Sequence, residues 1–159
     1  MKARKYKLFV DRKAKDVVVR TFESRSEAET VKIAKDFAKT LKPGDIVALA
    51  GDLGAGKTAF TKGVAQAFGV SADVTSPTFT IVNQYDGEEI TLYHFDAYRL
   101  ENVSVDDCDW LDDYFFSEGV CLIEWAQNIE AILPRGYKTV RIEKNISLGQ
   151  DYREIVIEE

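Results

Sequence analysis

The segment GDLGAGKT at 51–58 constrains the 159-residue chain most, because it fits the pattern G-x-x-x-x-G-K-[ST]. An apolar run of strand length, 46–50, precedes it, and a helical pattern over 58–68 follows it. Glycines allow backbone conformations in which successive N–H groups converge on an anion, and the following helix directs its positive end there. The sequence therefore predicts a phosphate-binding loop between a buried strand and a helix.

The residues of this loop and of the first helical turn are the candidate nucleotide contacts. Lys57 can neutralise oxygens of the β- and γ-phosphates, and the Thr58 hydroxyl can join the shell of a Mg²⁺ that bridges them. The tetrapeptide N-K-x-D, which guanine-reading enzymes usually carry, does not occur in the sequence, and this absence favours ATP. The full candidate set is Gly51, Asp52, Leu53, Gly54, Ala55, Gly56, Lys57, Thr58 and Ala59.

Two predicted strands end in acids that could complete such a site. The strand over 90–96 ends at Asp96, and the strand over 120–124 ends at Glu124. Ligands of open α/β sheets bind outside the carboxyl ends of the strands. We therefore expect both acids to serve as metal ligands or to orient the attacking water, with the division of roles left open. The alternative is that each carboxylate caps the next helix or pairs with Arg99.

Two further residues are candidates on weaker patterns. Thr78 lies in SPTFT at 76–80, where a loop that senses the γ-phosphate is often placed; the alternative is a plain loop that enters a strand. His94 is the only histidine, and strand alternation puts it on the same face as Asp96. A packed, structural histidine is favoured over a catalytic one.

The remaining pattern mixes helices, strands and hairpins within a single domain, 1–159. We expect an α/β fold, a three-layer sandwich resembling P-loop NTPases, with a mixed central sheet. Asp86-Gly87 between two β-rich segments predicts a hairpin, and Ser26 with Glu29, or Ser24 with Glu27, is a possible capping box. The expected helices are 26–41, 105–116 and 126–133, and the expected strands are 8–10 paired with 17–22, then 78–85, 89–96, 120–125, 139–144 and 152–157.

Charge and composition limit the classes of partner. Residues 1–16 form a basic extension with seven Lys/Arg and two Asp, a net charge of +5. The net charge of the whole chain is −6, so the other residues together carry −11. A net negative charge argues against direct binding of nucleic acid by this chain, because phosphates are bound mainly by Lys and Arg. No apolar run is long enough for a membrane span or a signal peptide, and Cys108 and Cys121 have no metal-ligand spacing. We expect a cytoplasmic protein with buried thiols.

Four segments together resemble the bacterial TsaE family, the P-loop ATPase of tRNA threonylcarbamoyladenosine modification. They are GD at 44–45 leading into the glycine loop, SPTFT at 76–80, YHFDAYRL at 93–100 and IEW at 123–125. Their order and spacing agree from about residue 24 to about residue 134. The glycine loop is common to many families, whereas the set of the other three in this order is specific.

The resemblance implies a cytosolic, Mg²⁺-dependent ATPase that acts through the TsaB and TsaD proteins and reaches tRNA only indirectly. By position the resemblance implies that Lys57 and Thr58 contact the phosphates and the metal and that Asp96 is the acid that binds the metal. It also implies that Glu124 is an essential acid near the metal and the attacking water. It also implies that Thr78 is the switch threonine. Adenine contacts would come partly from 26–30, with Thr30 among them.

Two other functions remain open. A small-molecule or nucleotide kinase fits the length and the glycine loop, but such kinases usually clamp the transferred group with several arginines. Here the arginines after Gly69 are scattered: Arg99, Arg135, Arg141 and Arg153. A nucleotide-sensing module without hydrolysis is the second alternative, and the intact Lys57, Thr58, Asp96 and Glu124 argue against it.

Overall fold

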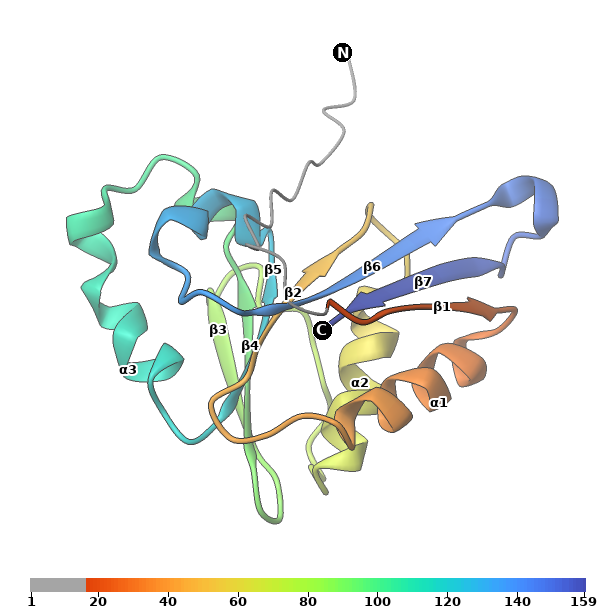
Figure 1. The fold of residues 1–159 in the computed structure, drawn as a ribbon, viewed down its shortest axis with the longest axis horizontal. Helices are drawn as coiled ribbons and strands as arrows, with labels where there is room; N and C mark the ends of the chain where they lie inside the picture. The colour runs from red at the N-terminus through yellow and green to blue at the C-terminus, as the bar shows by residue number, and fades with distance from the viewer. Residues whose placement is uncertain (1–16) are drawn as a thin grey trace.

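The computed structural model describes residues 17–159, and within them one sheet has the strand order β1-β7-β6-β2-β5-β4-β3 (Figure 1). The strands are β1 Val19–Ser24, β2 Ile46–Ala50, β3 Val82–Asp86, β4 Thr91–Asp96, β5 Val120–Glu124, β6 Lys138–Lys144 and β7 Arg153–Glu158. The helices are α1 Glu27–Ala38, α2 Lys57–Ala67 and α3 Asp112–Phe115, and the 3₁₀ helices are η1 Tyr98–Leu100, η2 Val105–Leu111, η3 Ala126–Ile132 and η4 Ile146–Leu148.

The sheet is mixed, with a parallel centre and antiparallel edges. β2 pairs in parallel with both β5 and β6, and β4 pairs in parallel with β5. The pairs β1–β7, β6–β7 and β3–β4 are antiparallel. The central strands β2 and β5 read as continuous apolar runs because both of their faces are covered.

Helical segments cover both faces, which confirms the expected three layers. Figure 1 shows α1 and α2 together on one side of the sheet and α3 on the other. Alternate strand residues separate the two cores: Leu49 and Leu122 pack with α1 and α2, whereas Ala48 and Ile123 pack with η2, α3 and η3. Glycine at 63 allows α2 to approach α1, since a Cβ there would collide with Ala34 and with the Val31 backbone.

Local signals explain where α1 begins. The Ser26 side chain accepts a hydrogen bond from the Glu29 N–H at 3.1 Å, as the capping prediction requires. The Glu29 carboxylate accepts from the Arg25 N–H at 2.6 Å, one residue before the position that a capping box would use. The first helical turn is therefore satisfied by its own sequence.

Several predicted elements differ from the structure. The strand expected over 78–85 begins only at Val82, because 78–80 form a turn. The helix expected over 105–116 is a 3₁₀ helix, η2, followed by the four-residue α3. The segment 126–133 is also 3₁₀, with a kink at Ile129. In each of these segments the local pattern was too weak to fix the backbone conformation, which depends also on tertiary context.

The predicted N-terminal hairpin is tested only in part. Its segment 17–22 contributes to β1, which pairs with β7, while 8–10 and the rest of the basic extension lie outside the described residues.

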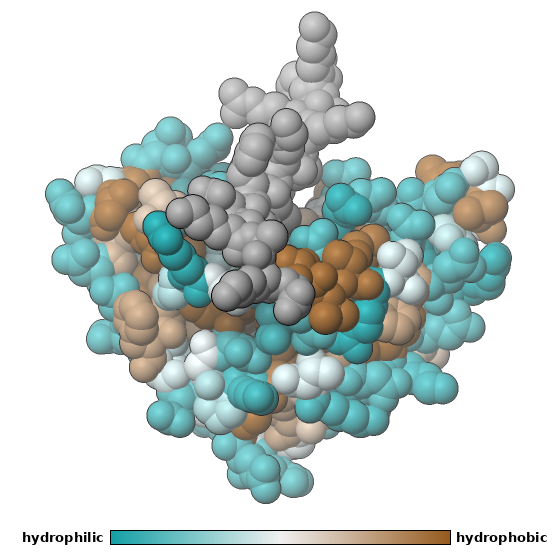
Figure 2. All heavy atoms as spheres, in the orientation of Figure 1, coloured by the Kyte–Doolittle hydropathy of each residue, from teal (hydrophilic) through white to brown (hydrophobic). Residues whose placement is uncertain are grey.

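Cys108 and Cys121 are both buried free thiols, as expected. Within 17–159, no helix is long and apolar enough to cross a membrane. Apolar side chains are exposed at the tip of the β6–β7 hairpin, where η4 carries Ile146 and Leu148 (Figure 2).

Candidate functional site

The glycine loop lies between β2 and α2, where the sequence predicts it. Gly54 and Gly56 have φ of 70° and 109°, values that favour glycine. Gly51 is needed for close approach, since a Cβ there would lie 2.7 Å from the Ile142 carbonyl oxygen of β6. The N-cap residue of α2 is Gly56, which offers no side chain to the first N–H groups of the helix. These N–H groups can therefore serve an anion.

The ammonium of Lys57 lies over this loop. Its Nζ donates to the carbonyl oxygens of Gly51, at 2.6 Å, and Asp52, at 3.2 Å. It also lies 4.0 Å from Oε2 of Glu124. The cation thus connects the loop to the carboxylate at the end of β5.

The two acids are neighbours across the sheet. Asp96 and Glu124 are directly paired in the parallel register of β4 and β5, and Glu124 is paired with Leu49 of β2, two residues before Gly51. Both carboxylates face the α2 side, and they are only 5% and 6% exposed. Two buried like charges at adjacent positions require compensation, so their partners define the chemistry of the site.

Asp96 is held by uncharged donors. Its Oδ1 accepts from the Tyr98 backbone N–H at 3.0 Å, and its Oδ2 accepts from the Thr78 hydroxyl at 3.1 Å. Within 17–159 Asp96 takes part in no ion pair. A buried carboxylate without a protein cation is a suitable ligand for a hard divalent cation such as Mg²⁺.

Glu124 has cationic and histidine partners instead. His94 is fully buried, and its Nε2 lies 3.0 Å from Oε1 of Glu124. Toward an ionised Glu124 carboxylate, which can only accept, Nε2 would be the donor of this hydrogen bond. The sequence favoured a packed histidine, and His94 is packed, but its contact is with a candidate catalytic residue. Glu124 does not pair with Arg99, and neither does Asp96.

The SPTFT segment folds over Asp96. The Ser76 and Thr78 hydroxyls lie 2.8 Å apart, and Thr78 reaches Asp96 as described above. Phe79 is 83% exposed, and the Arg99 guanidinium lies 5.1 Å from its ring centroid. Ile81 has φ of 66°, an unusual conformation for a β-branched residue. A strained turn thus joins the predicted switch threonine to β3.

The segment after Glu124 completes one wall of the site. Trp125 has φ of 58°, and its ring packs edge-on against Tyr98 at 5.1 Å. A small hollow beside the glycine loop is lined by Leu49, Ala50, Gly51, Lys57, Trp125 and Gln127. Trp125 is therefore placed to report optically on this loop.

Some predicted residues take other positions. The Thr30 side chain is buried, and its hydroxyl lies 2.8 Å from the Ser24 hydroxyl, so it ties α1 to β1. This contact gives the Thr30 side chain a structural role, and its contact with adenine stays a prediction. Leu53 is 95% exposed at the tip of the loop, whereas Ala55 is buried. Asp52 and Gly54 are exposed, and Thr58 and Ala59 are half-buried in the first turn of α2.

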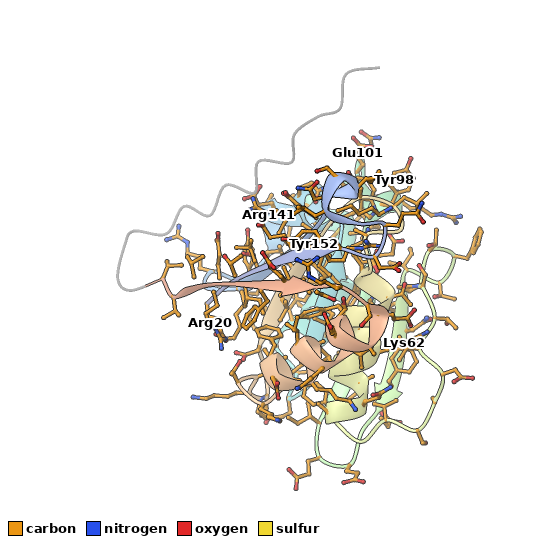
Figure 3. All side chains as sticks on the ribbon, turned by 90° about the vertical axis from the view of Figure 1, so that its right-hand side faces the viewer. Arg20, Lys62, Tyr98, Glu101, Arg141 and Tyr152 are labelled. Carbon is orange, nitrogen blue, oxygen red and sulfur yellow. The ribbon has the colours of Figure 1, made fainter. Side chains whose placement is uncertain are left out.

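Two residues that the sequence analysis did not assign touch the loop from outside. Lys144 and Arg153 donate to its carbonyl groups from the ends of β6 and β7. The one feature of the sequence that could have pointed to them is their position on either side of the connection between the last two predicted strands. Figure 3 views this side of the molecule and labels Tyr152, the residue before Arg153 in the chain, and Arg20, at the other end of the β1–β7 pair.

The candidate metal ligands at this edge of the sheet are one hydroxyl and two carboxylates. In the described part of the chain, no group of three or more His, Cys, Asp and Glu side chains gathers as a metal cage. A Mg²⁺ at a nucleotide site is usually held by one or two protein groups together with phosphates and waters. Thr58, Asp96 and Glu124 fit that need.

Comparison with known proteins adds an independent finding. A family model described as "Threonylcarbamoyl adenosine biosynthesis protein TsaE" matches residues 24–155. The chain belongs to the TsaE family. Membership places it among the proteins of threonylcarbamoyl adenosine biosynthesis, and it confirms the resemblance seen in the four segments.

Individual relatives of this TsaE-family chain agree over most of their length. The tRNA threonylcarbamoyladenosine biosynthesis protein TsaE of Bacillus subtilis (strain 168) is 50% identical over 127 residues, 80% of this chain and 77% of that protein. The protein of the same name from Treponema pallidum (strain Nichols) is 37% identical over 142 residues, 84% of this chain and 96% of that protein. The crystal structure of YdiB from Bacillus subtilis superposes with a TM-score of 0.75 at 41% identity, and it covers 91% of this chain and 88% of that one. The α/β fold is thereby confirmed.

Proposed function

We propose that this TsaE-family chain is a Mg²⁺-dependent ATPase that serves tRNA threonylcarbamoyladenosine biosynthesis through the TsaB and TsaD proteins. One observation carries the ATPase part of the proposal. The Lys57 ammonium, which lies on the glycine loop, is 4.0 Å from Glu124, and Glu124 is directly paired with Asp96. The groups to which we assign phosphate binding, water activation and metal binding thus lie at one end of the sheet.

The residues divide the work of hydrolysis between them. The loop N–H groups and Lys57 bind phosphate oxygens, and Lys57 stabilises the charge that develops on them. Glu124 orients the attacking water and accepts its proton as the new oxygen–phosphorus bond forms and the bond to ADP breaks. Thr58 and Asp96, with Glu124, would hold Mg²⁺, which neutralises charge on the phosphates when bound. Thr78, whose hydroxyl donates to Asp96 at 3.1 Å, is assigned as the residue that senses the γ-phosphate.

The partner part of the proposal rests on the family and on charge. Seven acids and no Lys or Arg lie between Glu101 and Glu118, the segment that contains η2 and α3. The same segment exposes Val105, Trp110 and Phe116. An acidic surface with exposed apolar groups suits contact with a protein better than contact with tRNA, because phosphates repel it. Action through TsaB and TsaD therefore fits the surface better than direct tRNA binding.

The substitution Lys57→Ala tests the nucleotide site. We expect ADP affinity to fall at least about tenfold, with hydrolysis lost, because the ammonium group that lies over the loop is removed. Lys62→Ala is the matched control, since Lys62 lies on the same helix but faces Glu27 at 3.9 Å. Calorimetry and circular dichroism give affinity and folding. Wild-type ADP affinity in Lys57→Ala would remove this loop from the proposal.

A second measurement separates the partner-dependent ATPase from a kinase. ATP turnover is measured for the chain alone, with TsaB and TsaD, and with a panel of small phosphoryl acceptors. We expect stimulation by the two proteins and release of inorganic phosphate. Strong stimulation by one small acceptor, with transfer of phosphate to it, would favour the kinase instead.

A further inference from the structure

The carbonyl groups of the glycine loop are bound from outside by two cations. Nζ of Lys144 donates to the Leu53 oxygen at 3.0 Å, and Nε of Arg153 donates to the Ala55 oxygen at 2.7 Å. Nη2 of Arg153 lies 3.5 Å from the Gly54 oxygen, at the limit of a hydrogen bond. The carbonyl oxygens of three successive residues, 53–55, are thus contacted by the charged groups of two side chains.

The two cations act from one place in the sheet. Lys144 is the last residue of β6 and Arg153 the first of β7, and they face each other in the antiparallel register. Alternation puts both side chains on the same face as Ile142 and Ile155, which pack towards α1 and α2. Nη1 of Arg153 also donates at 2.8 Å to the carbonyl oxygens of Gln150 and Tyr152, so the guanidinium is held on both sides.

Peptide geometry converts these contacts into an orientation of the loop's donors. A trans peptide is planar, so the C=O of one residue and the N–H of the next point in opposite directions. Carbonyls of Leu53 and Ala55 that are held outward direct the N–H groups of Gly54 and Gly56 inward. The intervening N–H of Ala55 instead donates to the Asp52 oxygen at 3.0 Å. Between Leu53 and Gly56, the N–H groups left for an anion are therefore those of Gly54 and Gly56, which the two cations orient and which adjoin the first N–H groups of α2.

We propose that Lys144 and Arg153 are positioning residues that hold the glycine loop in its phosphate-binding conformation before any nucleotide arrives. The inference rests on the proposed function, and it adds an element that the glycine motif does not contain. Glycines make the loop conformation accessible but do not select it, since they permit many others. Fixing the carbonyls reduces the ordering that binding would otherwise require.

Substitutions at the two positions, and at one control, test this role. Arg153→Met and Lys144→Met remove the donors and keep an unbranched side chain, while Arg153→Lys keeps the charge but not the two-sided guanidinium. Arg141→Met is the control, because Arg141 lies on the opposite face of β6 and contacts Glu143 at 3.2 Å. Urea unfolding midpoints establish that each variant is folded at the temperature used.

The first readout is the affinity for ADP by calorimetry. We expect Arg153→Met to bind about tenfold more weakly, Lys144→Met a few-fold more weakly, and Arg141→Met like the wild type. Arg153→Lys should remain several-fold weaker than the wild type. Wild-type affinity in Arg153→Met would overturn the proposal, because the loop would then bind ADP equally well without the contact to the Ala55 oxygen.

The second readout is the amide resonances of Gly54 and Gly56 in the ligand-free, ¹⁵N-labelled protein. We expect both to shift in Arg153→Met and to stay unchanged in Arg141→Met. Unchanged Gly54 and Gly56 resonances in Arg153→Met would overturn the positioning role, whatever the affinities. This measurement needs no nucleotide, so it tests the positioning role even if the wild type does not bind ADP. Failure of the wild type to bind ADP would contradict the proposed function and leave the result for the positioning role unchanged.

Discussion

The imidazole of His94 and the carboxylate of Glu124 form a buried hydrogen bond, 3.0 Å from Nε2 to Oε1, between adjacent strands. The other carboxylate oxygen, Oε2, lies 4.0 Å from Nζ of Lys57. Each oxygen of Glu124 therefore has its own partner. The histidine determines which way the carboxylate turns, and with it which oxygen faces the glycine loop.

Replacing His94 should lower hydrolysis without weakening nucleotide binding. In His94→Leu the Oε1 atom loses its donor, so the carboxylate is free to rotate, and we expect turnover with TsaB and TsaD to fall about tenfold or more. His94→Gln is the matched variant, because its amide N–H can reach the same oxygen, and it should retain most of the activity. ADP affinity should stay within about threefold in both. Equal turnover in the two variants would mean that His94 acts only by filling space.

Glu124→Gln should separate hydrolysis from binding. The amide keeps the shape and can still meet His94, but it cannot accept a proton from water, so we expect hydrolysis to fall by about two to four orders of magnitude. ADP affinity should change only a few-fold, since the loop and Lys57 bind the phosphates. Single-turnover hydrolysis with the partner proteins measures the first, and Trp125 fluorescence during an ADP titration measures the second. Near-wild-type hydrolysis would leave Glu124 a structural role.

Asp96→Asn should raise the Mg²⁺ requirement of hydrolysis. The amide oxygen can still accept from the Tyr98 N–H, and the amide NH2 can donate to the Thr78 hydroxyl instead of accepting from it, so local structure is kept while the charge that favours the metal is lost. We expect the half-maximal Mg²⁺ concentration to rise about tenfold. The measurement is a Mg²⁺ titration of ATP hydrolysis, with Asp86→Asn of the β3–β4 hairpin as a control. An unchanged titration would exclude Asp96 from the metal site.

The carboxylate of Glu159, which lies away from the site, should contribute to the free energy of unfolding in a way that depends on pH. Burial raises the pKa of its side chain, but the hydrogen bond from Thr40 and the charges of Arg20 and Lys138 outweigh this and hold the pKa below the ordinary 4.5. A lowered pKa means that the carboxylate stabilises the fold fully above about pH 4.5 and loses this effect as the pH falls through the folded-state pKa.

We therefore expect Glu159→Gln to unfold more easily at pH 7, by about 1 kcal/mol or less, as for other partly exposed ion pairs. The difference should shrink below about pH 4.5 as the wild-type carboxyl takes up its proton. Urea unfolding of both proteins at several pH values measures it. Glu118→Gln is the control, and a difference that grows with acid would contradict the assignment.

Much of the site could be predicted because its signals are local. The glycine loop is specified by residue types whose backbone freedom depends on nothing distant, and β2 and β5 are recognisable as apolar runs. Asp96 and Glu124 could be placed at strand ends for the same reason. The weaker predictions fell where the local pattern was ambiguous: at η2, at η3 and at the turn before Val82, packing selected 3₁₀ and turn geometry over helix and strand.

Local patterns are enough to place a glycine loop after a buried strand and an acid at the end of two further strands. Which residues meet at that edge of the sheet depends on the tertiary structure. The pairing of His94 with Glu124 requires β4 beside β5, and the contacts of Lys144 and Arg153 with the loop require the β6–β7 hairpin beside β2. The burial of Thr30 requires α1 against β1. Strand order joins residues far apart in the chain, and periodicity within a segment carries no information about which segments lie side by side.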